Sequence, residues 1–238
     1  MTGQPLGPHR SWADVRGISF DLGGTLVRPE AEPTTGQVAQ LLGISLAEAR
    51  TLMEQKAKRC RISPADLAGE LAAAFLRPDL VGRLTYVLER ARQRAGQPDV
   101  YDDVRPALAA LREQGLALFA MTNSLGSSLP EHTPAAFQDL TRVLYSAETG
   151  AVKPERAAFT AVENASGLRP KQLLHVGNSL RADVEGAAAA GFHAAWLNRA
   201  RADVAVPPGT VCLRTLTDLP LLLSAGPAPV PIRNSEAH

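Results

Sequence analysis

The sequence reads Val15-Arg16-Gly17-Ile18-Ser19-Phe20-Asp21-Leu22-Gly23-Gly24-Thr25-Leu26 near its beginning, and this stretch decides the fold. The apolar segment of residues 15–20 stops abruptly at an acid, which two glycines follow. An apolar run that ends in this way predicts a buried strand entering a tight loop. We therefore expect a strand over residues 15–20, with Asp21 at its carboxyl end.

A long helical stretch follows this loop. Ser45 and Glu48 have the spacing of a capping box at the start of one helix. Another helix begins at Ser63-Pro64, and a third is expected over residues 79–95, where apolar residues make one stripe. No strand pattern interrupts residues 29–98, which therefore predict an all-helical cap inserted into another domain.

The pattern after Pro98 alternates between strands and helices. We expect strands over residues 116–121, 143–146, 173–176, 193–197 and 211–213, and helices over 104–114, 154–166, 182–190 and 218–224. Repeated strand-then-helix units predict an α/β fold, a doubly wound parallel sheet of the Rossmann-like kind with helices on both faces. The core would combine residues 15–28 with 99–225, and the Pro-rich segment 226–238 would be a disordered tail.

The composition excludes several classes of protein. The 238 residues are 45% apolar and 21% charged, and a formal net charge of +1 argues against a nucleic-acid or anionic-membrane binder. No run approaches the roughly 18 apolar residues of a transmembrane helix. Residues 1–17 lack the apolar segment of a secretory signal, and Cys60 and Cys212 are too few for a disulfide scaffold or a zinc site. These features predict a globular protein of the cytoplasm.

Chemically active side chains follow several of the expected strands. Asp21 comes after the first strand, Thr122-Asn123-Ser124 after the second, and Lys153 after a loop that leaves the third. Asn178 follows the next strand, with Asp183 shortly after it. Because ligands of such sheets bind beyond the carboxyl ends of the strands, we expect these groups to meet in one crevice. The set suits a nucleophile, a hydrogen-bond donor, a charge-neutralising cation and a carboxylate that partners a metal or the lysine.

These segments resemble the motifs of the haloacid dehalogenase-like hydrolase superfamily, particularly the branch whose helical cap follows the first motif. The resemblance covers about residues 15–219. It rests on four segments in the family's order: 20–26, where the family has Asp-x-Asp-Gly-Thr, 121–124, 150–154 and 175–187. Each motif alone has low specificity, whereas four in order on the expected elements indicate the fold.

The resemblance implies a role for each of these residues. Asp21 would be the nucleophile and form a covalent ester that water later cleaves. Thr122 would hydrogen-bond the transferring group, and Lys153 would neutralise charge beside Asp21. A Mg²⁺ cofactor would be held by Asp21, the Gly23 carbonyl, Asn178 and Asp183. A small phosphorylated substrate would contact Gly24, Thr25, Asn123 and Arg28.

Two positions depart from the family's pattern. Gly23 stands where the family's phosphatases have a second Asp, which protonates the leaving alkoxide. Since general acid–base catalysis contributes roughly 10²–10⁴-fold, alkyl phosphates should react slowly unless another group substitutes. Asn178 stands where the usual metal-binding Asp would be, so Mg²⁺ should bind more weakly, although Asp183 could compensate.

The function favoured by these features is a metal-assisted phosphatase of a small phosphorylated metabolite, such as a sugar phosphate, working through an aspartyl-phosphate. A metal-independent 2-haloacid dehalogenase is one alternative, because it also lacks the second Asp and could receive halide at Arg28. Another is a non-catalytic descendant that binds phosphorylated ligands, since Gly23 and Asn178 both replace carboxylates. The most remote is a carbon–phosphorus hydrolase in which Lys56 or Lys58 forms a Schiff base.

Two further features favour structural roles. His175 lies within an apolar strand, which is typical of a core histidine rather than a catalytic one. A basic cluster at the end of an expected cap helix is typical of a solvated face, and it would attract anionic substrates if it were functional. Its members are Lys56, Lys58, Arg59 and Arg61.

Overall fold

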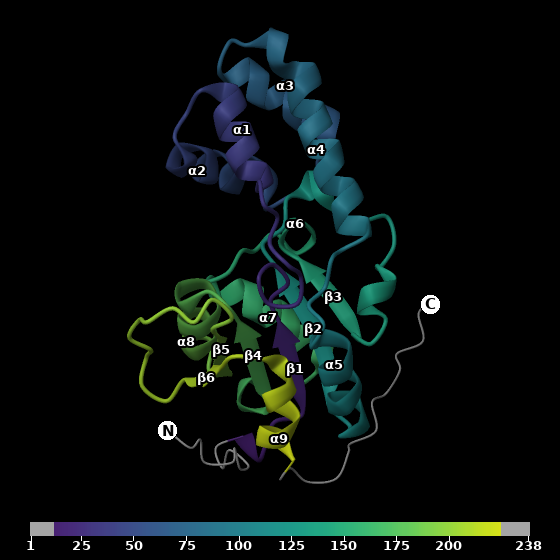
Figure 1. Ribbon diagram of the computed structural model, residues 1–238, viewed down its shortest axis with the longest axis vertical. Helices are drawn as coiled ribbons and strands as arrows, with labels where there is room; N and C mark the ends of the chain where they lie inside the picture. Colours follow the sequence, from purple (N-terminus) through teal and green to yellow (C-terminus); the bar gives the residue numbers. More distant parts are fainter. Residues whose placement is uncertain (1–11, 225–238) are drawn as a thin grey trace.

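The computed structural model describes residues 12–224, which form a parallel sheet with helices on both faces and a helical cap over one edge (Figure 1). The strands of this part of the chain are β1 (Gly17–Phe20), β2 (Ala117–Thr122), β3 (Arg142–Tyr145), β4 (Leu173–Gly177), β5 (His193–Leu197) and β6 (Val211–Leu213). They lie in the order β3-β2-β1-β4-β5-β6, and every neighbouring pair is parallel. The predicted α/β fold class is confirmed. The predicted tail, residues 226–238, lies outside the described residues.

Strand β1 lies where the strand order reverses. The chain passes from β1 to β2 and β3 on one side, and then returns to β4, β5 and β6 on the other. Gly17 pairs with Ala117 of β2 and with Leu173 of β4, so the three central strands share one register. Their carboxyl ends therefore meet at one edge of the sheet, where sheets of this type bind ligands.

Helices bury both faces of the sheet. The α-helices of the described residues are α1 (Thr34–Leu42), α2 (Leu46–Ala57), α3 (Pro64–Ala74), α4 (Val81–Gly96), α5 (Val104–Glu113), α6 (Ser146–Thr149), α7 (Arg156–Ser166), α8 (Gly186–Ala189) and α9 (Leu219–Leu223). Leu108 of α5 and Leu222 of α9 pack in one apolar cluster with the sheet, and Phe159 of α7 and Ala187 of α8 pack in another. Every residue of β1 and β4 is buried as a result, which explains their continuous apolar runs.

One predicted helix differs in its geometry. The segment expected as a helix over residues 182–190 is a π-helical segment, Leu180–Glu185, followed by the short helix α8. The Ser179 hydroxyl caps the segment by accepting the Ala182 N–H at 3.1 Å. The Ser179 N–H in turn donates to Oδ2 of Asp183 at 2.9 Å. Such wide turns are rare and frequent at functional sites, and this one places the Asp183 carboxylate beside β4.

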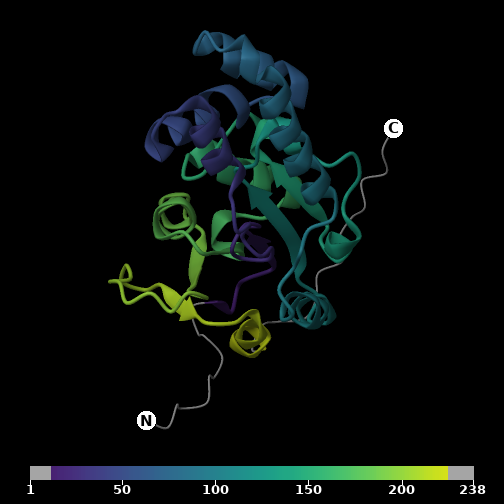
Figure 2. The same cartoon turned by 45° about the horizontal axis from the view of Figure 1, so that its top comes forward.

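The cap consists of α1 to α4, which lie over the carboxyl edge of the sheet (Figure 2). The predicted capping box is present, because the Ser45 hydroxyl accepts the Glu48 N–H and the Glu48 carboxylate accepts the Ser45 N–H. The cap has its own apolar cluster, which includes Met53, Leu71 and Leu84. No helix of residues 12–224 has both the length and the apolar character needed to cross a membrane.

Core and cap also meet closely at residues 125 and 126 of the core. Leu125 of the core belongs to the apolar cluster of the cap. At the next residue, Gly126, a Cβ atom would lie 1.9 Å from the carbonyl oxygen of Cys60, so only glycine permits this approach. At the hinge, the Arg28 N–H donates to the Asp99 carbonyl at 2.8 Å and joins the two chain segments that connect core and cap.

Candidate active site

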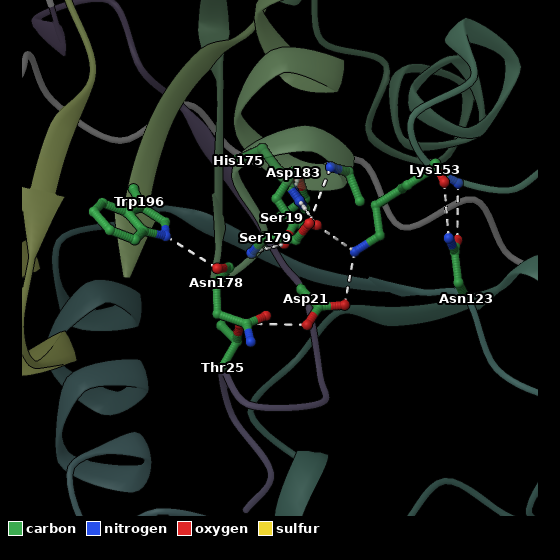
Figure 3. Close-up of polar contacts among 11 residues, drawn as sticks. Ser19, Asp21, Thr25, Asn123, Lys153, His175, Asn178, Ser179, Asp183 and Trp196 are labelled. Carbon is green, nitrogen blue, oxygen red and sulfur yellow. Dashed lines mark hydrogen bonds and ion pairs between the residues drawn. The ribbon is translucent and has the colours of Figure 1, made fainter. Parts of the chain in front are cut away.

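Three charged side chains meet at the carboxyl edge of the sheet (Figure 3). The Nζ atom of Lys153 donates to Oδ1 of Asp21 and to Oδ1 of Asp183, and each distance is 2.7 Å. The side chains of Lys153 and Asp183 are 3% and 2% exposed, and that of Asp21 is 13% exposed. Buried charges are tolerated only when they are paired, so each member of this trio depends on the others.

The protonation states in the trio are coupled. Burial acts against the charge on Lys153, but the two carboxylates outweigh it and hold the lysine pKa above its ordinary value. Burial raises the pKa of Asp21, and the charge of Asp183 adds to this rise while Lys153 opposes it. Burial also acts on Asp183, but Lys153 and His175 outweigh it and hold the pKa of that carboxyl well below its usual range. Lys153 is therefore cationic and Asp183 anionic.

His175 lies beneath Asp183 in the core. Its Nε2 atom is 3.3 Å from Oδ1 of Asp183, and its Nδ1 atom is 2.8 Å from the hydroxyl of Ser19 on β1. Burial lowers the pKa of His175, so the imidazole is neutral at neutral pH. Because a carboxylate only accepts hydrogen bonds, Nε2 carries the proton and Nδ1 accepts from Ser19. The sequence indicates a core histidine here, but not its contact with the charged trio.

The loop after β1 packs against Asn178. The Thr25 hydroxyl is 3.3 Å from Oδ2 of Asp21 and 3.4 Å from Oδ1 of Asn178, so these two side-chain oxygens lie on the same side of the loop. Gly24 has a φ of +78°, and a Cβ atom there would lie 2.4 Å from Nδ2 of Asn178. Glycine is therefore required both for the backbone conformation and for the close approach. Trp196 donates to the Asn178 carbonyl at 3.0 Å and fixes its backbone.

Asn123 holds the backbone segment that carries Lys153. Its Oδ1 atom accepts the Lys153 N–H and its Nδ2 atom donates to the Lys153 carbonyl, both at 2.8 Å. Two hydrogen bonds from one amide fix both the position and the direction of this segment. The residue that was expected to contact substrate thus also aligns the lysine.

Arg199 is a positioning residue that the sequence analysis missed. Its guanidinium donates to the Thr25 carbonyl from Nε at 3.1 Å and from Nη2 at 2.9 Å. It also makes two hydrogen bonds to the Asp103 carboxylate, at 2.9 Å each. Arg199 therefore ties the loop after β1 to α5. Arg199 comes shortly after the end of β5, and Asn178 comes directly after the end of β4. This position beyond a strand end is the sequence feature that could have indicated a role for Arg199 near the site.

A cavity of about 550 Å³ lies between the core and the cap. The residues that line it include Gly23, Thr122, Asn123 and Tyr145 from the core and Lys58 and Arg94 from the cap. The Thr122 hydroxyl makes no hydrogen bond with any residue in the range 12–224, so it is available to a ligand. Burial raises the pKa of Tyr145 to about 12, which keeps its phenol protonated.

Arg28 also lines the cavity, but acids of the core engage its guanidinium. The Nη2 atom donates to Asp102 at 2.9 Å, and the Nε atom is 3.6 Å from Asp99. The guanidinium carbon lies 4.7 Å from the centre of the Tyr101 ring. The residue that was expected to receive a substrate anion thus already has two acidic partners.

Two members of the basic cluster on the cap face core acids. Arg59 makes two hydrogen bonds with the Glu155 carboxylate, one of them at 3.0 Å, and Arg61 pairs with Glu148. Glu155 also accepts the Val152 N–H at 3.2 Å, next to Lys153. These pairs connect the cap to the segment that carries Lys153. Arg59 and Arg61 therefore contact the core, whereas the sequence pattern is typical of a solvated face.

The oxygen atoms at this edge fit one magnesium ion. Asp21 supplies a carboxylate, Asn178 an amide oxygen and Gly23 a backbone carbonyl, and the first two lie together beside Thr25. Both oxygens of Asp183 accept hydrogen bonds from the protein. Among the described residues, no group of three or more His, Cys, Asp or Glu side chains could hold a metal. Since Mg²⁺ keeps several waters and commonly takes one or two carboxylates with substrate phosphates, this set fits an ion that binds together with a phosphate ester.

The model of the haloacid dehalogenase-like hydrolase family matches residues 15–191, and the chain belongs to that family. It is similar to phosphoglycolate phosphatase of Aliivibrio fischeri, with 28% identity over 196 residues that cover 76% of this chain and 82% of that protein. It is also similar to phosphoserine phosphatase of Thermus thermophilus, with 34% identity over 110 residues, 45% of this chain and 44% of that protein. The chain spans less than half the length of several curated relatives that it matches.

Solved structures share the fold over most of the chain. A 2-haloacid dehalogenase from Pseudomonas syringae pv. Tomato superposes with a TM-score of 0.64 at 20% identity, covering 88% of this chain and 98% of that one. A phosphatase of the same family from Thermococcus onnurineus gives 0.54 at 25% identity, covering 86% and 96%. These likenesses extend over the cap as well as the core. They show a fold that phosphatases and dehalogenases have in common.

Proposed function

We propose that the protein is a phosphohydrolase that acts on a small phosphorylated metabolite through an aspartyl-phosphate at Asp21. The observation that supports this most directly is the Lys153 ammonium, which bridges the Asp21 and Asp183 carboxylates at 2.7 Å. Gly23, two residues after Asp21, and Thr122 line the cavity between core and cap. A cation held beside a nucleophilic carboxylate can neutralise the charge of an arriving phosphoryl group. Phosphatases among the curated relatives support the same substrate class.

The reaction divides into two displacements at phosphorus. A carboxylate oxygen of Asp21 forms a bond to phosphorus while the bond from phosphorus to the ester oxygen breaks. The departing alkoxide takes its proton from solvent, because Gly23 offers none. Water then attacks the aspartyl-phosphate and releases inorganic phosphate and the Asp21 carboxylate. The Thr122 hydroxyl donates to the transferring group, while Asp183 and Asn123 hold Lys153 in place.

In this proposal Mg²⁺ is held by Asp21, Asn178 and the Gly23 carbonyl. When bound, the ion would stabilise negative charge on the phosphoryl oxygens. Asp183 serves chiefly to fix the Lys153 ammonium, since both of its oxygens already accept hydrogen bonds from the protein.

The test is phosphate release from a panel of sugar, acyl and aryl phosphates, with and without Mg²⁺. Asp21→Asn should abolish release, because an amide cannot form the covalent ester. Asp79→Asn, which changes an exposed acid of the cap, is the matched control and should leave the rates unchanged. The proposal fails if no ester is turned over, and Asp21 loses the role of nucleophile if its variant stays active.

A metal-independent dehalogenase is the second candidate. It is favoured by the lack of a second carboxylate at position 23, where the chain has glycine. Asp21 would attack carbon, and halide would leave without needing a proton. Halide release from 2-haloacids in the presence of a chelator would support this candidate. Binding of phosphate esters with neither activity would instead indicate a non-catalytic protein.

A further inference from the structure

The cavity between core and cap, with a volume of about 550 Å³, is larger than a phosphoryl group requires. Its core lining includes Gly23 and Thr122 beside the nucleophile, and its cap lining includes Lys58, Ala91 and Ala95. A substrate whose phosphoryl group lies at Asp21 would therefore direct the rest of its structure toward the cap. The cap side chains that line the cavity then determine which substrates fit.

Three cationic side chains line this cavity, and two of them already have acidic partners. Arg28 pairs with Asp102 at 2.9 Å. Arg94 makes two hydrogen bonds with the carboxylate of Glu30, at 2.8 Å and 3.0 Å. Within the part of the chain that the structure describes, Lys58 forms no ion pair and no hydrogen bond through its ammonium. Of these three cations, Lys58 is therefore the one whose charge a bound anion could neutralise.

Lys58 is held where water solvates it poorly. It ends α2, and its side chain is half-buried against the cavity. Burial lowers its pKa, while Glu54, one turn earlier on α2, opposes the shift. Lys56, two residues away, is exposed and lies 3.4 Å from Glu70. The two lysines thus differ in their environment although they share one helix end.

We propose that Lys58 binds a carboxylate at the end of the substrate remote from the phosphoryl group, so that the protein selects small phosphate monoesters with a second, carboxylate charge. This inference rests on the proposed function. A single free ammonium matches a monovalent carboxylate, whereas a second phosphate would bring a charge of about −1.5 to −2. Charge-assisted hydrogen bonds of this kind are stronger than neutral ones, and Lys58 is half-buried against the cavity.

The experiment compares 3-phosphoglycerate with glycerol 3-phosphate, which differ only by a carboxylate in place of a hydroxymethyl group. Binding is measured by calorimetry with Mg²⁺ in the Asp21→Asn background, where turnover cannot interfere. Adding Lys58→Met should weaken 3-phosphoglycerate binding roughly 10- to 100-fold and change glycerol 3-phosphate binding by about twofold or less. Adding Lys56→Met should change neither, and Lys58→Arg should restore most of the affinity for 3-phosphoglycerate.

Several results would overturn the inference. These are equal losses for both ligands in the Lys58→Met protein, an equal loss in the Lys56→Met protein, or no binding of 3-phosphoglycerate while Lys58 is intact. Failure of Lys58→Arg to restore the preference would show that the site does not depend on charge. Turnover of the panel of sugar, acyl and aryl phosphates by the unmodified protein is assayed separately. Its absence would refute the proposed function, while the binding ratio would still decide the role of Lys58.

Discussion

The Nζ atom of Lys153 lies 2.7 Å from Oδ1 of Asp21, although 132 positions separate the two residues in the chain. The same ammonium also contacts Asp183, so a single cation balances two buried carboxylates. This arrangement keeps the proposed nucleophile close to a fixed positive charge. It also makes the stability of the core depend on the charge state of its active site.

Replacing Lys153 by Met should therefore destabilise the protein in a pH-dependent manner. Two buried carboxylates would face each other without a cation, and breaking a buried ion pair costs about 3–5 kcal/mol. The cost should be smaller at pH 5 than at pH 8, because protonation of a carboxyl relieves the repulsion. Urea unfolding at both pH values measures this, with the exposed Lys171→Met as control. An equal loss at the two pH values would contradict the coupling.

Gly23→Asp should supply the general acid that the chain lacks. A Cβ atom at Gly23 meets no other atom within 4 Å, so a side chain can start there without a clash at Cβ. If the protein is a phosphatase, alkyl phosphate rates should rise by at most roughly 10²–10⁴-fold, while aryl phosphates, which need little protonation, should gain less. The ratio of alkyl to aryl rates at saturating Mg²⁺ is the measurement.

Gly23→Asn is the matched control for this change, because it has nearly the same shape and cannot transfer a proton. It should leave the rate ratio as in the unmodified protein. A ratio that stays constant in a folded Gly23→Asp protein would show that this position does not substitute for a missing acid.

His175 should make the free energy of unfolding fall as the pH drops below about 6.5. Its pKa is lowered in the folded protein, so the unfolded chain binds a proton that the buried ring does not. Stability then rises with pH by at most about 1.4 kcal/mol per pH unit. Asp183, whose folded pKa is also lowered, adds an effect of the same sign at lower pH.

The measurement is urea unfolding between pH 7 and pH 5.5 in the presence of a chelator. His175→Gln should flatten the dependence, even though the variant is less stable throughout. The exposed His132→Gln serves as the control and should keep the slope of the unmodified protein. An unchanged slope in the His175→Gln protein would disprove the assignment.

The ion pair between Arg59 and Glu155 should hold the cap near the catalytic lysine. Because both side chains are partly exposed to solvent, a double-mutant cycle with Arg59→Gln and Glu155→Gln should give only a small coupling that decreases with salt. The same variants should raise KM by a few-fold, since cap closure encloses the substrate. The pair of Arg156 and Glu163, both within α7, is the control that should leave KM unchanged.

The sequence alone determined the elements that depend on neighbouring residues. The apolar run before Asp21, the capping box at Ser45 and the alternation after Pro98 are local patterns, because strands and helices are recognised by the spacing of residues a few positions apart. The placement of Asp21, Thr122 and Lys153 after expected strands added the expectation that they meet at one edge of the sheet. In the structure Lys153 contacts Asp21, and Thr122 lines the neighbouring cavity.

The tertiary structure decided which partners each charged side chain has. Nothing in the sequence distinguishes Lys58, free beside the cavity, from Arg28, whose guanidinium core acids engage. Similarly, the contact of His175 with Asp183 depends on a π-helical turn that no residue pattern indicated. Pairing and burial of charges depend on contacts between segments far apart in the chain. These contacts exist only once the sheet, its helices and the cap have packed together.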